Sequence, residues 1–145
     1  MADLRMTEYR RKFDKRVTIV VGQGGTVAAD IALGAIRFGV RALILKAYAV
    51  IGADIAAASA TVDKVAIGLF DRGAAGAGST QVGSDVDNTA SLADDIVHNF
   101  KADGYILAED SVIGIEQNWT EAATPGAIVL TSPTIIVEWI PFPAV

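Results

Sequence analysis

The feature that most constrains the fold is a series of short apolar runs, rich in β-branched residues, that turn signals separate. Residues 17–21 read Val-Thr-Ile-Val-Val and end at Gly22. In residues 62–70 apolar side chains alternate with others, and a last run, residues 135–139, stops before Pro141. Alternation with a period of two predicts strands, and about seven to nine short strands with frequent turns are typical of a sandwich, jelly roll or barrel. We therefore expect an all-β domain, a jelly-roll-like β-sandwich.

Residues 31–40 carry one change of phase. Ile31 and Leu33 alternate with other residues, and beyond Gly34 the apolar positions continue from Ile36 in the opposite phase. A slip of one residue beside a glycine is typical of a β-bulge or a strand bend. The sequence therefore predicts an irregular strand at this position.

Residues 42–51 are apolar at nearly every position. Strict alternation would place Leu43 and Leu45 on the same face as Ala47, with Ile44 on the opposite face. Because both faces are largely apolar, we predict a central strand or one that a neighbouring subunit covers. Leu, Lys and Ala also favour helices, so a helix stays open as the alternative.

Residues 1–16 form a polar arm, and residues 17–145 hold the predicted β domain. The arm has six basic and three acidic residues, a net charge of +3, while the whole chain carries −5 and the remainder therefore −8. A basic arm can bind nucleic acid or an acidic protein surface. The acidic body argues against broad contact with phosphates, so we expect no nucleic-acid partner. The favoured prediction is an arm that orders against a partner, with a short amphipathic helix as the alternative.

The amino-acid counts exclude several kinds of site. The chain has no cysteine and one histidine, His98, so it has no disulfide, no thiolate metal site and no site of several histidines within one chain. There is no uninterrupted apolar run of about 18 residues, the length needed to cross a bilayer. The charged start does not resemble a secretory leader. We expect no membrane partner and synthesis in a cytoplasm.

A glycine-rich turn resembles the opening of a dinucleotide-binding unit. Residues 22–26 read Gly-Gln-Gly-Gly-Thr after a predicted strand, and Ala-rich sequence follows. The third glycine of G-x-G-x-x-G would fall on Val27, and residues 42–51 contain no acid to hold a ribose. We predict a turn between two strands and no cofactor. An enzyme domain that binds a nucleotide with residues 22–26 stays as the less favoured alternative.

The acidic segment 85–95 resembles the start of a calcium loop. The EF-hand pattern needs a glycine and a glutamate where this chain has Ala90 and Ile96, so that loop is excluded, although an irregular ion site stays open. The favoured prediction is a solvated acidic loop and no metal site.

No group of residues predicts catalysis. The adjacent carboxylates of Asp94 and Asp95, like those of Glu109 and Asp110, would point to opposite faces of a strand. No G-x-S-x-G pattern selects a serine nucleophile. We predict that His98 makes an ordinary hydrogen bond and that the chain has no catalytic residues.

Residues 41–70, the glycine-rich loop after them and residues 104–113 (Gly-Tyr-Ile-Leu-Ala-Glu-Asp-Ser-Val-Ile) resemble small proteins encoded near major capsid proteins. These are the jelly-roll decoration, or cement, proteins of tailed-bacteriophage capsids. The resemblance covers roughly residues 40–140 and is one of pattern, without a chemical motif. It implies a jelly-roll body, commonly trimeric, that sits on the capsid exterior and stabilises the shell.

Together, the residues and the resemblance lead us to expect a non-enzymatic virion protein, assembled in the host cytoplasm. Its expected partners are the major capsid protein and two further copies of itself. A phage tail or receptor-binding module shares the architecture and stays as the alternative. The candidate interface residues are basic residues of the arm and large aromatic residues of the body: Arg10, Arg11, Lys12, Phe13, Tyr48, Trp139 and Phe142.

Overall fold

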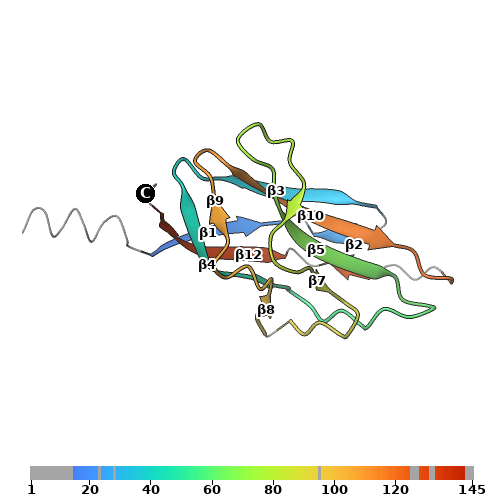
Figure 1. The fold of residues 1–145 in the computed structure, drawn as a ribbon. Helices are drawn as coiled ribbons and strands as arrows, with labels where there is room; N and C mark the ends of the chain where they lie inside the picture. The colour runs from blue at the N-terminus through green and yellow to red at the C-terminus, as the bar shows by residue number, and fades with distance from the viewer. Residues whose placement is uncertain are drawn as a thin grey trace, which may run out of the picture.

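The computed structural model describes residues 15–22, 24–27, 29–94, 96–124, 128–130 and 133–142 (Figure 1). Within these ranges the chain forms twelve strands and no helix, and every strand pair is antiparallel. The helix that residues 42–51 left open is therefore excluded. Residues 42–50 form a strand because neighbouring strands pair with them on both sides and satisfy their backbone groups.

Two five-stranded sheets make up the body. The first holds β1 (Arg16–Val21), β12 (Thr134–Pro141), β4 (Ala42–Val50), β8 (His98–Asn99) and β9 (Ile106–Leu107), the last two both pairing with β4. The second holds β3 (Ile31–Arg37), β10 (Val112–Thr120), β5 (Lys64–Asp71), β6 (Thr80–Gln81) and β7 (Val86–Asp87), the last two both pairing with β5. A separate ladder joins β2 (Gly25–Val27) to β11 (Ile128–Leu130).

The strand pairs are nested along the sequence. β1 pairs with β12, β3 with β10, β4 with β8 and β9, and β5 with β6 and β7. Successive nested pairs alternate between the two sheets, as in a long hairpin rolled into two layers. This arrangement is that of a jelly roll, which confirms the predicted fold class.

Two bulges set which side chains face inward. In β3 the register with β10 shifts between Ile115 and Glu116, which leaves Leu33 as the extra residue beside Gly34. The irregularity predicted there is confirmed. In β4 the register with β12 shifts between Glu138 and Trp139, which leaves Leu45 as the extra residue.

The bulge at Leu45 corrects the faces predicted for β4. Ala47 and Ile44, predicted on opposite faces, are both buried, whereas Leu45 is 37 % exposed. Because the extra residue reverses the alternation, Leu43 and Ile44 exchange the faces that strict alternation gave them. β4 lies between β12 and the short strands β8 and β9, as predicted for a central strand.

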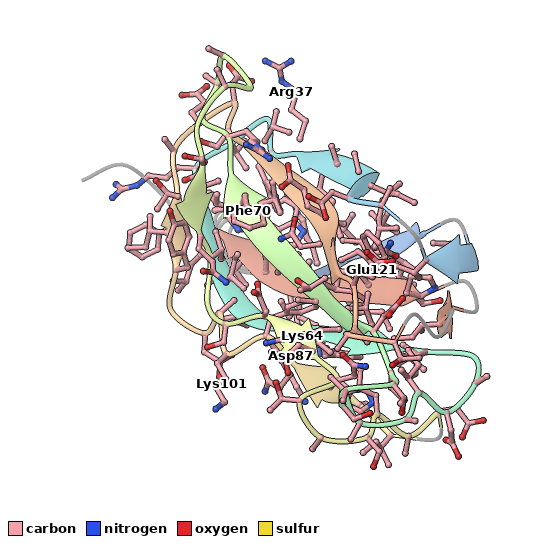
Figure 2. The ribbon with its side chains drawn as sticks, turned by 90° about the vertical axis from the view of Figure 1, so that its right-hand side faces the viewer. Arg37, Lys64, Phe70, Asp87, Lys101 and Glu121 are labelled. Carbon is pink, nitrogen blue, oxygen red and sulfur yellow. The ribbon has the colours of Figure 1, made fainter. Side chains whose placement is uncertain are left out.

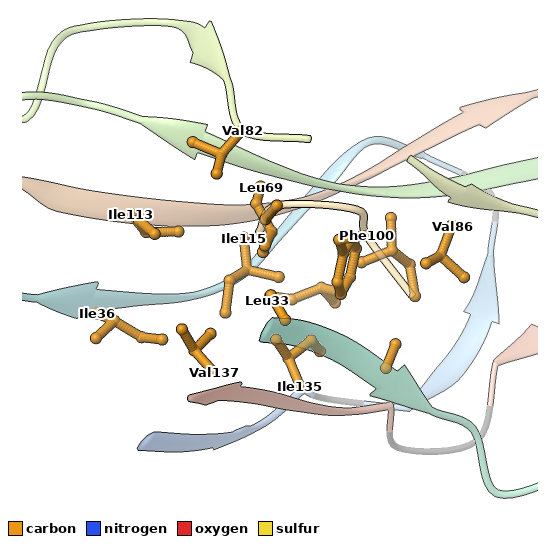
Figure 3. Packing of buried hydrophobic residues seen from close by; sticks show 14 of the residues in the cluster. Leu33, Ile36, Leu69, Val82, Val86, Phe100, Ile113, Ile115, Ile135 and Val137 are labelled. Carbon is orange, nitrogen blue, oxygen red and sulfur yellow. The ribbon is translucent and has the colours of Figure 1, made fainter. Parts of the chain in front are cut away.

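The core lies between the two sheets (Figure 3). Its members are buried aliphatic and aromatic side chains from both sheets and the loops, among them Leu33, Ile36, Leu69, Val86, Phe100, Ile113, Ile115, Ile135 and Val137. Burying a Val, Leu, Ile or Phe side chain contributes about 1.5–3 kcal/mol each, so this layer is the main source of stability.

Buried polar groups hold the loops at one end of the sandwich. Asp63 accepts hydrogen bonds from the indole N–H of Trp119 (3.0 Å) and the backbone N–H of Ala122 (2.9 Å). In the described part of the chain no buried side-chain polar atom lacks a partner. Satisfied groups of this kind fix loop positions at little cost in desolvation.

Candidate interaction surface

The outer face of the first sheet is rich in exposed apolar side chains. On β1, Val17, Ile19 and Val21 are 51 %, 60 % and 65 % exposed. The alternate residues of this strand face the body, because Thr18 bonds to Trp139 there. The outward row of β1 is therefore apolar and open to solvent.

The strand register extends this row across the sheet. Ile19 lies opposite Ile136 of β12, which lies opposite Tyr48 of β4. In the same way Val21 leads through Thr134 to Val50. The side chains of β12 and β4 in these rows are half-buried. The Ile19 row is apolar over three strands, while the Val21 row contains the hydroxyl of Thr134.

Charged groups interrupt this apolar face. Lys15 Nζ is 3.1 Å from Glu138 Oε1 on the outer face. On the inner side of β1, the Arg16 guanidinium lies over the buried Trp139 ring, 5.1 Å from its centroid. Lys46 Nζ lies 5.1 Å from the centroid of the Tyr48 ring. Lys15 and Arg16, which the sequence analysis assigned to the arm, therefore contact the body.

The predicted interface residues fall into three groups. Tyr48 lies on the outer face of the first sheet, and Phe142 is half-buried beneath the Arg41 guanidinium, 4.9 Å from its ring centroid. Trp139 is instead a core residue that packs edge-on against Phe38 with ring centroids 5.0 Å apart. Its position does not support a role as an interface anchor, because little of its surface is free to contact a partner. The four basic and aromatic arm residues lie outside the described residues: Arg10, Arg11, Lys12 and Phe13.

Val17, Ile19 and Val21 were not predicted as surface residues. The signal was present, because residues 17–21 are apolar or β-branched at every position and not only at alternate ones. A strand of this composition is covered on both faces or exposes an apolar row. Only the structure places β1 at the edge of its sheet, where the second face is open.

The outer face of the second sheet is polar (Figure 2). Arg72 pairs with Glu116, and Lys64 Nζ lies 3.5 Å from Asp87 Oδ2, as the figure shows for the latter pair. Such a face is stable in water without a partner.

Two glycines let polar side chains lie flat on this second face. A Cβ at Gly68 would come within 2.6 Å of Asp85 Oδ1, and one at Gly114 within 3.0 Å of Arg72 Nε. Gln81 Nε2 donates a 2.7 Å hydrogen bond to the same Asp85 oxygen. The charged layer is thus built into the strand positions of the second sheet.

The acidic segment beside this face has two carboxyl groups with shifted pKa values. Partial burial and the charge of Asp87 raise the pKa of Asp85. Partial burial alone would also raise the pKa of Asp87, but hydrogen bonds from Thr89 and the charge of Lys64 outweigh it and lower the pKa. No group of three or more acidic or histidine residues in the described ranges could hold a metal ion. Within this segment Asp87 therefore pairs with Lys64, and Asp85 accepts a hydrogen bond from the Gln81 amide.

The glycine-rich turn connects strands. The Gly22 N–H donates a 2.7 Å hydrogen bond to the Pro133 carbonyl, and β2 begins at Gly25. A dinucleotide site needs free amides at the start of a helix, whereas here one amide is already bonded and the next element is a strand. The predicted turn between strands is confirmed.

His98 lies in a short strand of the first sheet. His98 begins β8, and its Nε2 lies 2.8 Å from the Ala93 carbonyl oxygen, the ordinary hydrogen bond that was predicted. No described helix is long and apolar enough to cross a membrane.

No protein-family model matches the sequence, and no curated protein matches it. Among solved structures, the infectious bursal disease virus VP2 subviral particle matches with a TM-score of 0.42 and 14% identity, over 87% of this chain and 32% of that one. The T=1 particles derived from infectious bursal virus match with a TM-score of 0.43 and 10% identity, over 87% and 32%. This chain thus spans about a third of the length of those proteins. The likeness is one of β architecture, and nothing about the function of this chain follows from it.

Proposed function

We propose that this chain is a non-enzymatic structural protein that attaches to the exterior of a tailed-phage capsid and stabilises the shell. Its partners in this role are the major capsid protein and further copies of itself, three in the assembled unit. The virion exterior is its place of action, after assembly in the host cytoplasm.

The observation that carries this proposal is the contrast between the two sheet faces. The outer face of the first sheet exposes Val17, Ile19 and Val21, while ion pairs cover the outer face of the second. Burying apolar surface is the main driving force of protein association, and exposed apolar patches mark interaction sites. The first sheet is therefore the face that docks, and the second faces water.

The sequence resemblance to decoration proteins supplies the kind of partner. A shell-stabilising protein needs a rigid body and a contact surface, and it needs no reactive group. The jelly roll and the apolar face meet both requirements, and the opposed charges of Lys46 and Glu138 within that face would set orientation. The basic arm adds attraction to an acidic patch on the shell.

Addition of purified protein to capsids stripped of it tests the proposal. Ile106 lies on the first sheet and is 43 % exposed, whereas Ile31 lies at the edge of the second sheet and is 44 % exposed. Ile106→Asp should lower capsid occupancy at least tenfold, because a charge would be buried against the shell. Ile31→Asp is the matched control and should bind as the unmodified chain does.

Equal occupancy for both variants would reject the docking face. Failure of the unmodified chain to bind capsids, together with binding to host cells, would replace this proposal with a receptor-binding role. Light scattering of the free protein measures the proposed assembly of three copies.

A further inference from the structure

The free edge of β1 differs from the other sheet edges. The edges opposite it consist of β6, β7, β8 and β9, which are two residues long each. The edge strand β3 is interrupted by the bulge at Leu33. β1 instead pairs with β12 over six residues without a register shift. Among the described strands it alone presents a long regular edge, and such an edge leaves alternate N–H and C=O groups ready to pair.

Contacts on its inner face hold β1 in position. The Trp139 indole N–H donates a 3.0 Å hydrogen bond to Thr18 Oγ1. Val20 lies against Gly34 of β3, where a Cβ would come within 2.8 Å of its Cγ1. The edge is thus formed before any partner arrives, so pairing would cost little ordering of the chain.

We propose that β1 pairs with β1 of a second copy, antiparallel about a two-fold axis at Ile19. In this register Ile19 lies opposite itself, Val17 opposite Val21, and Thr18 opposite Val20. Every pair is β-branched, which favours cross-strand packing. A contact of this kind is isologous and closes at two copies.

The order of side chains in β1 itself identifies a second copy as the occupant. At Ile19 the pattern reads nearly the same in both directions, so outward apolar residues meet only outward apolar residues. Arg16 falls opposite Gly22, so no like charges face each other. A shift by two positions would set Lys15 against Val21, and a shift by one would match outward residues with inward ones.

The pairing would join two apolar faces into one. Ile19 already lies opposite Ile136, which lies opposite Tyr48, so the row would continue through the two-fold axis into the second copy. The β1 contact adds a second interface to the self-association proposed above. Its role in a virion rests on the proposed function, whereas the contact itself can be tested on the purified chain. Where the contact among three copies also forms, the β1 contact links two such units, and the assembly holds an even number of chains.

A single cysteine at the axis tests the pairing. The chain has no cysteine. Cα atoms of directly opposed residues in an antiparallel pair lie about 4.5–5.5 Å apart, within the range that a disulfide bridges. Ile19→Cys should therefore give, under mild air oxidation, a non-reduced species of twice the 15.1 kDa chain mass. Ile96→Cys, an exposed isoleucine away from β1, is the control and should cross-link at least tenfold more slowly.

The register is tested by mixing two further variants. Val17→Cys and Val21→Cys should each cross-link poorly alone and efficiently together, because they lie opposite each other only across the axis. A mixture that links no faster than either variant alone would overturn this register.

A light-scattering measurement provides an independent test. Ile19→Lys should abolish the even-numbered species that the unmodified chain forms at tens of micromolar, and Ile96→Lys should leave it unchanged. The two-fold contact is wrong if Ile19→Cys links no faster than Ile96→Cys, or if the unmodified chain shows no even-numbered species. Capsid binding by the unmodified chain separates the two proposals: binding without an even-numbered species would leave the docking proposal standing, whereas an even-numbered species that ignores capsids would reject the docking proposal alone.

Discussion

Asn88 holds the start of β5 through Val65: its side-chain oxygen accepts a 2.9 Å hydrogen bond from the Val65 N–H. The Asn88 side chain is fully buried, and its amide nitrogen donates to the carbonyl oxygens of Ala56 (3.1 Å) and Asp63 (3.0 Å). One residue in a loop thus joins two other segments of chain. The geometry gives an amide, with both donor and acceptor, a role that no other small side chain can fill.

Asn88→Ala should lower the free energy of unfolding by about 3 kcal/mol, because buried backbone groups would lose their partners. Denaturant unfolding monitored by fluorescence measures it. Asn99→Ala is the control: its side chain also accepts from a backbone N–H, that of Lys101, but it is exposed and should cost about 1 kcal/mol or less. Equal losses for the two variants would contradict the importance of burial.

Thr18→Val should lower the stability of the fold, because it removes the hydrogen bond between β1 and the Trp139 indole. The substitution keeps the shape of the side chain but leaves the buried indole N–H without its acceptor, at a cost of about 1–2 kcal/mol. Thr80→Val, at an exposed position in β6, should change stability by less than about 0.5 kcal/mol. Thermal unfolding of both variants measures the difference, and equal melting temperatures would refute it.

Stability should fall at high pH because of Tyr105. Its hydroxyl donates a 3.0 Å hydrogen bond to Asp71 Oδ2, and partial burial together with that carboxylate raises the pKa of the tyrosine above its usual value of 10.0. Since the folded state holds the proton more tightly, this contribution is complete below pH 10 and is lost as pH rises through the folded-state pKa.

Unfolding of Tyr105→Phe, measured across the same pH range, should show a shallower decline than that of the unmodified chain. The control is Tyr48→Phe, since the contact of the Tyr48 ring is with the Lys46 ammonium group and not with a carboxylate. An identical pH dependence for Tyr105→Phe and the unmodified chain would assign the decline to other groups.

Removal of residues 1–14 should weaken attachment to capsids while the β body stays folded. The deletion stops before Lys15, since Lys15 and Arg16 contact the body. Changing Arg10, Arg11 and Lys12 to serine should weaken attachment less, and more visibly at low salt, because exposed ion pairs are individually small and screened. Unchanged occupancy of the truncated chain at two salt concentrations would remove the arm from the mechanism.

Several features of the fold were predictable from local sequence. The strand at residues 17–21, the turn at Gly22 and the irregularity beside Gly34 are all present. Each depends on neighbouring residues alone: a β-branched run, a glycine and a change of phase. The turn between the strands that end at Val21 and begin at Gly25 was also predicted, because the third glycine and the ribose acid of a dinucleotide-binding unit are missing.

The interaction surface was less predictable. Tyr48, a predicted interface residue, lies half-buried on the outer face, and for β4 as a whole the predicted faces hold only beyond Leu45. No glycine lies beside Leu45, so the sequence gives no local signal for this bulge. The bulge results from the pairing with β12, whose register shifts between Glu138 and Trp139. Trp139 itself looked like an interface residue because large aromatic residues favour both cores and interfaces.

The sequence by itself determined that this chain forms an all-β domain, since a period of two in its apolar residues can bury a face only as strands. The tertiary structure alone decided which strand lies at an edge and which face meets water. β1 and β5 are both apolar runs, yet neighbours flank β5 on both sides whereas β1 has one neighbour, β12. That difference arises from pairing between segments more than one hundred residues apart, as Ile19 and Ile136 show, and no local pattern encodes it.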